Sequence, residues 1–255
     1  MESDRQPEKS PEETIVVEAT DLNSGYEESQ VLFDISFTAR AHRITVILGT
    51  SGCGKTTLLK NLIRLHDPWS GSVRLFGEEI TALDEPEFDR IMKNVGVLFQ
   101  NGALLNSITV ADNVAVPLEQ HTELPREIID RLVRVKLELV EMGHTLAKLP
   151  SELSGGMRKR AALARAIALD PPLLFCDEPS AGLDPMTAAG LDRLILRMRD
   201  MLGITVVLVS HHVASIRRIA DDVVFMEKGR VLFHGPLKEA QTAGIRQIDD
   251  FFTNG

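Results

Sequence analysis

The chain has 255 residues, 44% hydrophobic and 25% charged, so it can bury a sizeable core and is neither collagenous, coiled-coil nor wholly disordered. Its 28 basic and 37 acidic residues give a formal charge of −9, which disfavours a binding mode dominated by nucleic-acid phosphates, and no nucleic-acid partner is expected. The two cysteines, Cys53 and Cys176, are too few for a disulfide framework and lack zinc-ligand spacing, as is typical of a reducing compartment.

Short β-branched runs alternate with longer helical patterns along most of the chain. Residues 1–13 are polar and acidic, contain two prolines, and predict a flexible tail without a signal peptide. Strands are predicted at residues 15–18, 44–48, 73–76, 95–99, 173–176, 204–209, 223–226 and 231–233. Helices between the later strands predict a mostly parallel sheet, whereas the closely spaced early strands predict an antiparallel flap. No run reaches the roughly 18 apolar residues that a membrane helix needs.

The helical patterns have recognisable starts and ends. Residues 101–153 lack a strong strand and carry an amphipathic helix that starts near Pro125, which predicts a helical insertion. Ser154 can cap a later helix, and Asp184, which precedes a proline, opens another that Gly203 closes. The sheet does not require residues 236–255, and we expect them to form a C-terminal extension.

A glycine-rich segment, GTSGCGKT at residues 49–56, follows an apolar strand and precedes a helical run. It fits the pattern G-x-x-x-x-G-K-[ST], in which backbone N–H groups and a helix N-terminus surround phosphates. Lys55 would place a cation near the β- and γ-phosphate oxygens, and Thr56 would bind Mg²⁺. A turn without a ligand is the alternative, which the combination of strand, lysine and helix disfavours. The predicted nucleotide-binding residues are Gly49, Thr50, Ser51, Gly52, Cys53, Gly54, Lys55, Thr56 and Thr57.

Two adjacent acids, Asp177 and Glu178, end the apolar strand predicted at residues 173–176. Asp177 would hold Mg²⁺, commonly through water, and Glu178 would orient and deprotonate the attacking water. The alternative is that both acids merely begin a solvated loop. The phosphate-binding segment on the same chain favours the catalytic interpretation.

The segment LSGGM at residues 153–157 resembles the LSGGQ signature of the ATP-binding cassette (ABC) family. Gln100, at a strand end, resembles the Q-loop glutamine of that family. The run SAGLD at residues 180–184 resembles its D-loop, and His211 resembles its switch histidine. Tyr26 is similar to the aromatic residue that stacks on adenine. These motifs occur in the family's order and cover most of the chain.

The resemblance implies an α/β P-loop NTPase fold, the ABC cassette, with a mostly parallel sheet, an antiparallel β flap and an inserted α-helical subdomain. It implies an ATP-binding core over residues 14–99 and 160–235 and an α-helical signature subdomain over residues 100–159. ATP and Mg²⁺ are the implied cofactors. The implied catalytic residues are Glu178, His211, Gln100 and Lys55, and the implied metal ligands are Thr56, Gln100 and Asp177. Further ATP contacts are implied for Tyr26, Ser154, Gly155, Gly156 and Asp184.

The signature predicts a second anion site, because Ser154 caps a helix whose N–H groups are bared by Gly155 and Gly156. The resemblance implies that this site receives the γ-phosphate of ATP held by a second copy, and therefore a homodimer. A glycine pair needed only for turn geometry is the alternative. The run RKR at residues 158–160 is predicted to be a charged, solvated helix face.

For several single residues a purely structural role is the alternative to the functional one. An isolated histidine such as His211 is usually a surface residue, and Tyr26 could simply pack at a strand edge. Gln100 could be a polar strand terminus, although its position beside the helical insertion favours a coupling role. The role of His212, at a position where the family often has aspartate, stays open.

A single cassette without a coiled-coil insertion favours a detached transporter subunit over the family's soluble machines. The segments VLFQNGAL (97–104), NVAVPL (113–118) and LSGGMRKR (153–160) resemble the Mla/Mce-type phospholipid transport ATPases. In that group the C-terminal tail reaches the partner cassette. The methionine within LSGGM departs from the general signature but removes no catalytic group.

This finer resemblance implies an ATPase subunit that powers phospholipid transport across the bacterial envelope. Transmembrane permease subunits and accessory lipid-binding subunits are the implied partners. The chain would then be cytoplasmic, peripheral on the inner membrane, and in contact with the membrane only through those partners. Another ABC importer or exporter, or a soluble ABC regulatory ATPase, is the alternative.

Overall fold

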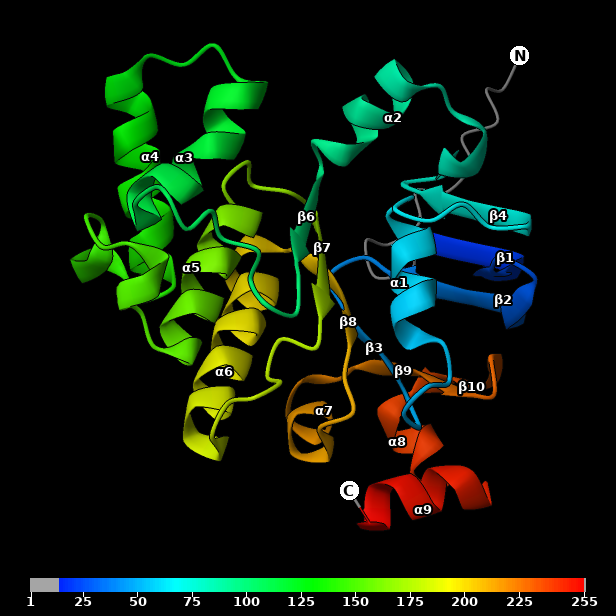
Figure 1. Cartoon of the computed structure of the whole chain (residues 1–255). Coiled ribbons are helices and arrows are strands. Elements are labelled where there is room, and N and C mark those ends of the chain that lie inside the picture. The colour runs from blue at the N-terminus through cyan, green and yellow to red at the C-terminus, as the bar shows by residue number, and fades with distance from the viewer. Residues whose placement is uncertain (1–13, 255) are drawn as a thin grey trace, which may run out of the picture.

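The computed structural model describes residues 14–254, and the tail predicted at residues 1–13 lies outside this range. Within it, two sheets form the α/β part of the molecule, and a group of helices lies to one side (Figure 1). The larger sheet has the strand order β10-β9-β3-β8-β7-β6, and the smaller has the order β2-β1-β4-β5.

The six strands of the larger sheet are parallel except for β10. They are β3 (Ile44–Gly49), β6 (Val95–Leu98), β7 (Leu173–Asp177), β8 (Thr205–Val209), β9 (Asp222–Glu227) and β10 (Arg230–Pro236). Every residue of β3, β7 and β8 is buried. Helices pack on one face of this sheet, and one helix together with the smaller sheet packs on the other. The mostly parallel sheet predicted from the sequence is confirmed.

The smaller sheet is the antiparallel flap predicted from the sequence. Its strands are β1 (Ile15–Tyr26), β2 (Ser29–Arg40), β4 (Ser70–Leu75) and β5 (Glu78–Glu79), and all of its pairings are antiparallel. Strands β2 and β5 were not predicted. In β2 buried and exposed side chains do not alternate regularly, because two residues separate the buried Leu32 from the buried Ile35. Asp34, between them, has φ +50°, so the period-two pattern that identifies a strand is interrupted there.

Nine α-helices lie within the described range. They are α1 (Lys55–Leu62), α2 (Glu85–Met92), α3 (Val110–His121), α4 (Arg126–Leu139), α5 (Gly155–Ala166), α6 (Pro185–Leu202), α7 (Val213–Ile219), α8 (Leu237–Ala240) and α9 (Arg246–Asn254). Ser154 Oγ accepts the Met157 N–H at 3.3 Å, and Asp184 Oδ1 accepts two N–H groups of α6 at 3.0 Å. Gly203 ends α6 at φ +66°, so these three predicted helix boundaries are observed.

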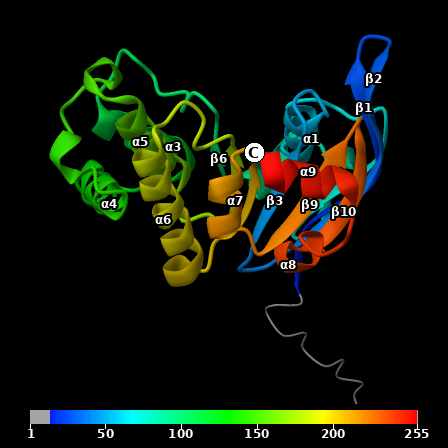
Figure 2. The same cartoon turned by 90° about the horizontal axis from the view of Figure 1, so that it is seen from below.

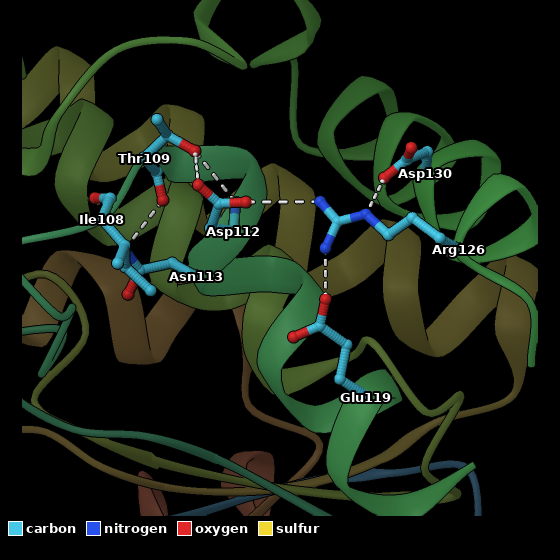
Figure 3. A network of polar contacts seen from close by, with 7 residues as sticks. All are labelled: Ile108, Thr109, Asp112, Asn113, Glu119, Arg126 and Asp130. Carbon is cyan, nitrogen blue, oxygen red and sulfur yellow. Dashed lines mark hydrogen bonds and ion pairs between the residues drawn. The ribbon is translucent and has the colours of Figure 1, made fainter. Parts of the chain in front are cut away.

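Helices α3, α4 and α5 form the laterally placed helical group. Arg126 joins α3 to α4, because its guanidinium contacts Asp112 (3.3 Å), Asp130 (2.8 Å) and Glu119 (Figure 3). These pairs are solvent-exposed, so each adds little stability alone. The predicted subdomain boundary between residues 159 and 160 falls inside α5, which continues without interruption into the core.

The C-terminal extension forms α8 and α9, which lie under the β9–β10 side of the sheet (Figure 2). Ile248 and Phe252 are buried in the main core, and Arg217 of α7 donates a hydrogen bond to the Phe252 carbonyl at 2.7 Å. Helix α9 therefore packs on its own chain in this structure. None of the helices between residues 14 and 254 is long and apolar enough to cross a membrane.

Candidate nucleotide site

The predicted phosphate-binding segment joins the end of β3 to the start of α1. Gly49, Gly52 and Gly54 all have positive φ values, of +147°, +77° and +101°. A Cβ on Gly49 would lie 2.0 Å from the Met226 carbonyl oxygen of the adjacent strand β9, so only glycine fits this approach. The segment thereby curls over the N-terminus of α1, where free N–H groups favour an anion.

Lys55 is buried beneath this curl. Its Nζ donates to the carbonyl oxygens of Gly49 and Thr50, each at 3.0 Å. The ammonium is thus held at the centre of the loop by weak neutral acceptors, and the more strongly charged phosphate oxygens would replace them as acceptors.

A cavity of about 490 Å³ opens in front of this loop. Gln100, Glu178 and His211 line it together with the loop residues, although these three lie far apart in the sequence. They meet because Gln100 follows β6, Glu178 follows β7 and His211 follows β8, and the carboxyl ends of parallel strands share one edge of the sheet.

Glu178 and His211 are already paired in this cavity. His211 Nδ1 lies 2.7 Å from Glu178 Oε1. The glutamate side chain is 13% exposed and the histidine side chain 64% exposed, so the carboxylate is shielded while the imidazole faces the open side. A carboxylate held by an imidazole beside a phosphate-binding loop is an arrangement suited to activating water.

Asp177 ends β7 and is 9% exposed. Its Oδ1 is buried and has no hydrogen-bond partner within the described range. Burial and the neighbouring Glu178 carboxylate raise the pKa of Asp177, while the ammonium groups of Lys60, Lys159 and Lys55 oppose that rise. A buried carboxylate oxygen without a hydrogen-bond partner, at the strand end beside Glu178, is suited to bind a cation.

The signature segment lines a separate, smaller cavity of about 340 Å³. Its walls include Gly155 and the D-loop residues Gly182 and Leu183, and it shares Gln100 with the larger cavity. A Cβ on Gly156 would lie 2.4 Å from Thr187 Cγ2, so this buried glycine lets α5 approach α6 closely. Gly155 is exposed, and the contact of either glycine with a phosphate stays a prediction.

A family model described as ABC transporter matches residues 32–181, which include the phosphate-binding loop, Gln100, the signature and the Asp177–Glu178 pair. This chain belongs to the ABC transporter family. It is an ATPase of that family, with the cassette fold expected from the sequence.

Relatives that carry ATP-binding transport names align along most of the chain. MlaF of Escherichia coli, an intermembrane phospholipid transport system ATP-binding protein, is 41% identical over 231 residues, which cover 89% of this chain and 86% of MlaF. The mkl protein of Mycobacterium tuberculosis, a probable ribonucleotide transport ATP-binding protein, is 38% identical over 241 residues, which cover 94% of this chain and 67% of mkl.

Solved ABC cassettes have the same fold. The cassette MJ0796, in a dimeric post-hydrolysis state bound to ADP and Pi, superposes with a TM-score of 0.80 at 26% identity, covering 87% of this chain and 98% of that one. The cbiO1 protein of Clostridium perfringens, part of the ABC transporter complex cbiONQ, superposes with a TM-score of 0.81 at 27% identity, covering 95% and 99%.

Besides the signature residues and the buried Cys53, two more predicted ATP contacts, Tyr26 and Asp184, do not line the larger cavity. The Tyr26 ring stacks on His66, with centroids 4.6 Å apart, and is 42% exposed. The Asp184 carboxylate accepts the N–H groups of Met186 and Thr187. A hydrogen bond from the Thr187 side chain, together with these N–H groups, lowers the pKa of Asp184. For both residues the structure shows a contact within the chain, and their contact with ATP stays a prediction.

Several residues at the ABC site were not identified from the sequence. Phe251 of α9 and Val31 of β2 line the larger cavity, and neither lies in a motif. His212 is the N-cap of α7, because its Nδ1 accepts the Ser215 N–H at 3.3 Å. An aspartate at an N-cap commonly accepts the same kind of hydrogen bond. Lys159 was predicted to be part of a solvated face, which is wrong, because it is only 7% exposed.

Proposed function

We propose that two copies of this chain form a composite ATPase that drives phospholipid transport through membrane-embedded partners. The observation that carries the enzymatic part is the Glu178–His211 pair, 2.7 Å apart, at the mouth of the phosphate-binding loop. Similarity to MlaF over most of both chains supports the transport part.

In the proposed reaction the Glu178 carboxylate orients the attacking water and takes its proton. His211 holds that carboxylate through Nδ1 and has its exposed ring edge available for the γ-phosphate. Lys55 exchanges its carbonyl acceptors for β- and γ-phosphate oxygens and offsets their charge. Gln100 lines both cavities, so a structural change at one cavity can be transmitted through this residue to the helical group.

The residues present fit a Mg²⁺ ion. Asp177 Oδ1 is orphaned, and the exposed Thr56 and Gln100 line the larger cavity with oxygen-bearing side chains. When bound, Mg²⁺ neutralises charge that develops on the phosphoryl oxygens. No cluster of three His, Cys, Asp or Glu side chains exists among residues 14–254, which suits an ion that is held partly by the nucleotide's own oxygens. Thr56, Asp177 and Gln100 would be its protein ligands.

The signature supports the dimer. Ser154 caps α5 and is exposed, and Gly155 lines the smaller cavity, so this anion site faces outward from the chain that carries it. The dimeric MJ0796 cassette supports a second copy as the source of the phosphate. Each copy would bind ATP on its own loop and complete the site of its partner.

Permease subunits, accessory lipid-binding subunits and a peripheral position on the cytoplasmic side of the inner membrane belong to the same proposal. The absence of a membrane-spanning helix in the described range is compatible with membrane contact through partners. The lipid specificity would lie on those partners, because neither cavity of the ATPase site is lined mainly by apolar groups.

Glu178→Gln tests the enzymatic part. It keeps the side-chain shape and removes the base, so turnover is expected to fall roughly 10²-fold or more while ATP binding is retained. Wild-type turnover in this variant would remove Glu178 from the role.

Affinity purification of the tagged chain from detergent-extracted native membranes tests the transport part. Mass spectrometry of the eluate is expected to find hydrophobic membrane partners and co-purifying phospholipid. Recovery of the chain with water-soluble partners alone would favour a soluble regulatory ABC ATPase.

A further inference from the structure

Lys159 is a buried cation that the proposed reaction does not use. It lies on α5, the helix that Ser154 caps, and is 7% exposed. Its Nζ donates to the backbone carbonyl of Glu178 at 3.2 Å. The same side chain lines the smaller cavity beside Gln100 and Gly155, so it lies where the Q-loop, the signature and the Asp177–Glu178 segment meet.

A buried ammonium group is costly unless it has partners of opposite charge or strong acceptors. Burial lowers the pKa of Lys159, and the negative charges of Glu178 and Asp177 act in the opposite direction. The groups that stabilise this cation are therefore those at the end of β7, where the chemistry is proposed to occur.

The backbone of Glu178 is in a conformation that requires support. Its φ is +45°, in the left-handed region, which costs a residue with a Cβ about 1–2 kcal/mol. Three hydrogen bonds hold the residue there. Its N–H donates to the Val209 carbonyl at 3.0 Å, and its carbonyl accepts the Ala181 N–H at 3.1 Å and the Lys159 ammonium. This backbone geometry places the side chain 2.7 Å from His211 Nδ1.

We propose that Lys159 is a positioning residue for ATP hydrolysis, whose ammonium holds the Glu178 carbonyl so that the Glu178 carboxylate stays beside His211. The inference rests on the proposed role of Glu178 as the general base. Because Lys159 and Ser154 share one helix, the helix that faces the partner's phosphate also holds the catalytic base of its own chain.

Lys159→Met tests this inference, because methionine keeps an unbranched side chain and removes every donor. A hydrogen bond from a charged donor corresponds to a factor of about 10–100, so kcat is expected to fall at least about tenfold. KM for ATP is expected to stay within about twofold, since Lys55 and the loop are untouched. Lys159→Arg restores a cationic donor and is expected to retain most of kcat.

Lys136→Met is the matched control. Lys136 is also a buried lysine, at 3% exposure, but its ammonium pairs with Asp170, beyond the C-terminal end of α5, and it lines neither cavity of the site. Wild-type kcat is expected for this control. A fall equal to that of Lys159→Met would show that loss of any buried lysine is sufficient, and would overturn the inference.

A double variant separates positioning from general damage. If Lys159 acts through Glu178, adding Lys159→Met to Glu178→Gln should not lower the residual turnover further. An additional tenfold loss, or wild-type kcat in Lys159→Met alone, would refute the inference.

If Lys159→Met does not fold, Lys159→Gln, whose shorter side chain cannot reach the carbonyl, replaces it with the same expectation. Wild-type turnover in Glu178→Gln alone would instead refute the proposed function.

Discussion

Gly49→Ala is expected to damage both the fold and the nucleotide site, because Gly49 lies against the backbone of a neighbouring strand. Its Cβ would be 2.0 Å from the Met226 carbonyl oxygen, whereas carbon and oxygen rarely approach closer than about 3.3 Å. Gly49 and Met226 are register partners of β3 and β9, and Met226 is completely buried, so relief requires the two strands to separate.

The cost has two parts. Overpacking in a well-packed interior costs about 1–3 kcal/mol, and the positive φ of Gly49 adds about 1–3 kcal/mol for a residue with a Cβ. The free energy of unfolding should therefore fall by about 2–6 kcal/mol, a large part of the usual 5–15 kcal/mol. ATP affinity should fall with it, because the carbonyl of Gly49 also holds Lys55.

Gly52→Ala is the matched control for this prediction. Gly52 also has a positive φ, of +77°, but a Cβ there meets no atom within 4 Å. Only the conformational cost of about 1–2 kcal/mol applies. Urea unfolding without nucleotide measures both variants. The reasoning fails if Gly49→Ala is within 1 kcal/mol of the wild type, or if Gly52→Ala is equally destabilised.

Substitutions at three further positions test separate features. Ser154→Arg places bulk and a cation at the proposed anion site, so ATP-induced dimerisation in size-exclusion chromatography should be lost, and an unchanged dimer would contradict a shared site. Lys55→Ala should weaken nucleotide binding at least tenfold in a fluorescence titration, since phosphate loses its buried cation; equal affinity would discredit the loop assignment. His212→Ala should lower the free energy of unfolding by about 1 kcal/mol through loss of the α7 cap, while His212→Asp should preserve it in the same urea assay.

The sequence alone determined those features whose causes are local. The strand, glycine turn, lysine and helix of the phosphate-binding loop are contiguous, and so are the caps provided by Ser154 and Asp184. Consecutive strands separated by helices also predicted the parallel sheet, and the carboxyl ends of such strands necessarily share one edge. Glu178 and His211 could therefore be expected at one site before any coordinates were known.

The tertiary structure decided everything that depends on which distant surfaces meet. Gly156 is needed because Thr187 of α6 lies against it, and Lys159 is buried because α5 packs over the end of β7. Phe251 reaches the nucleotide cavity only because α9 folds back along α7. No local pattern distinguishes such residues from exposed ones, since a side chain's burial and partners are set by long-range packing.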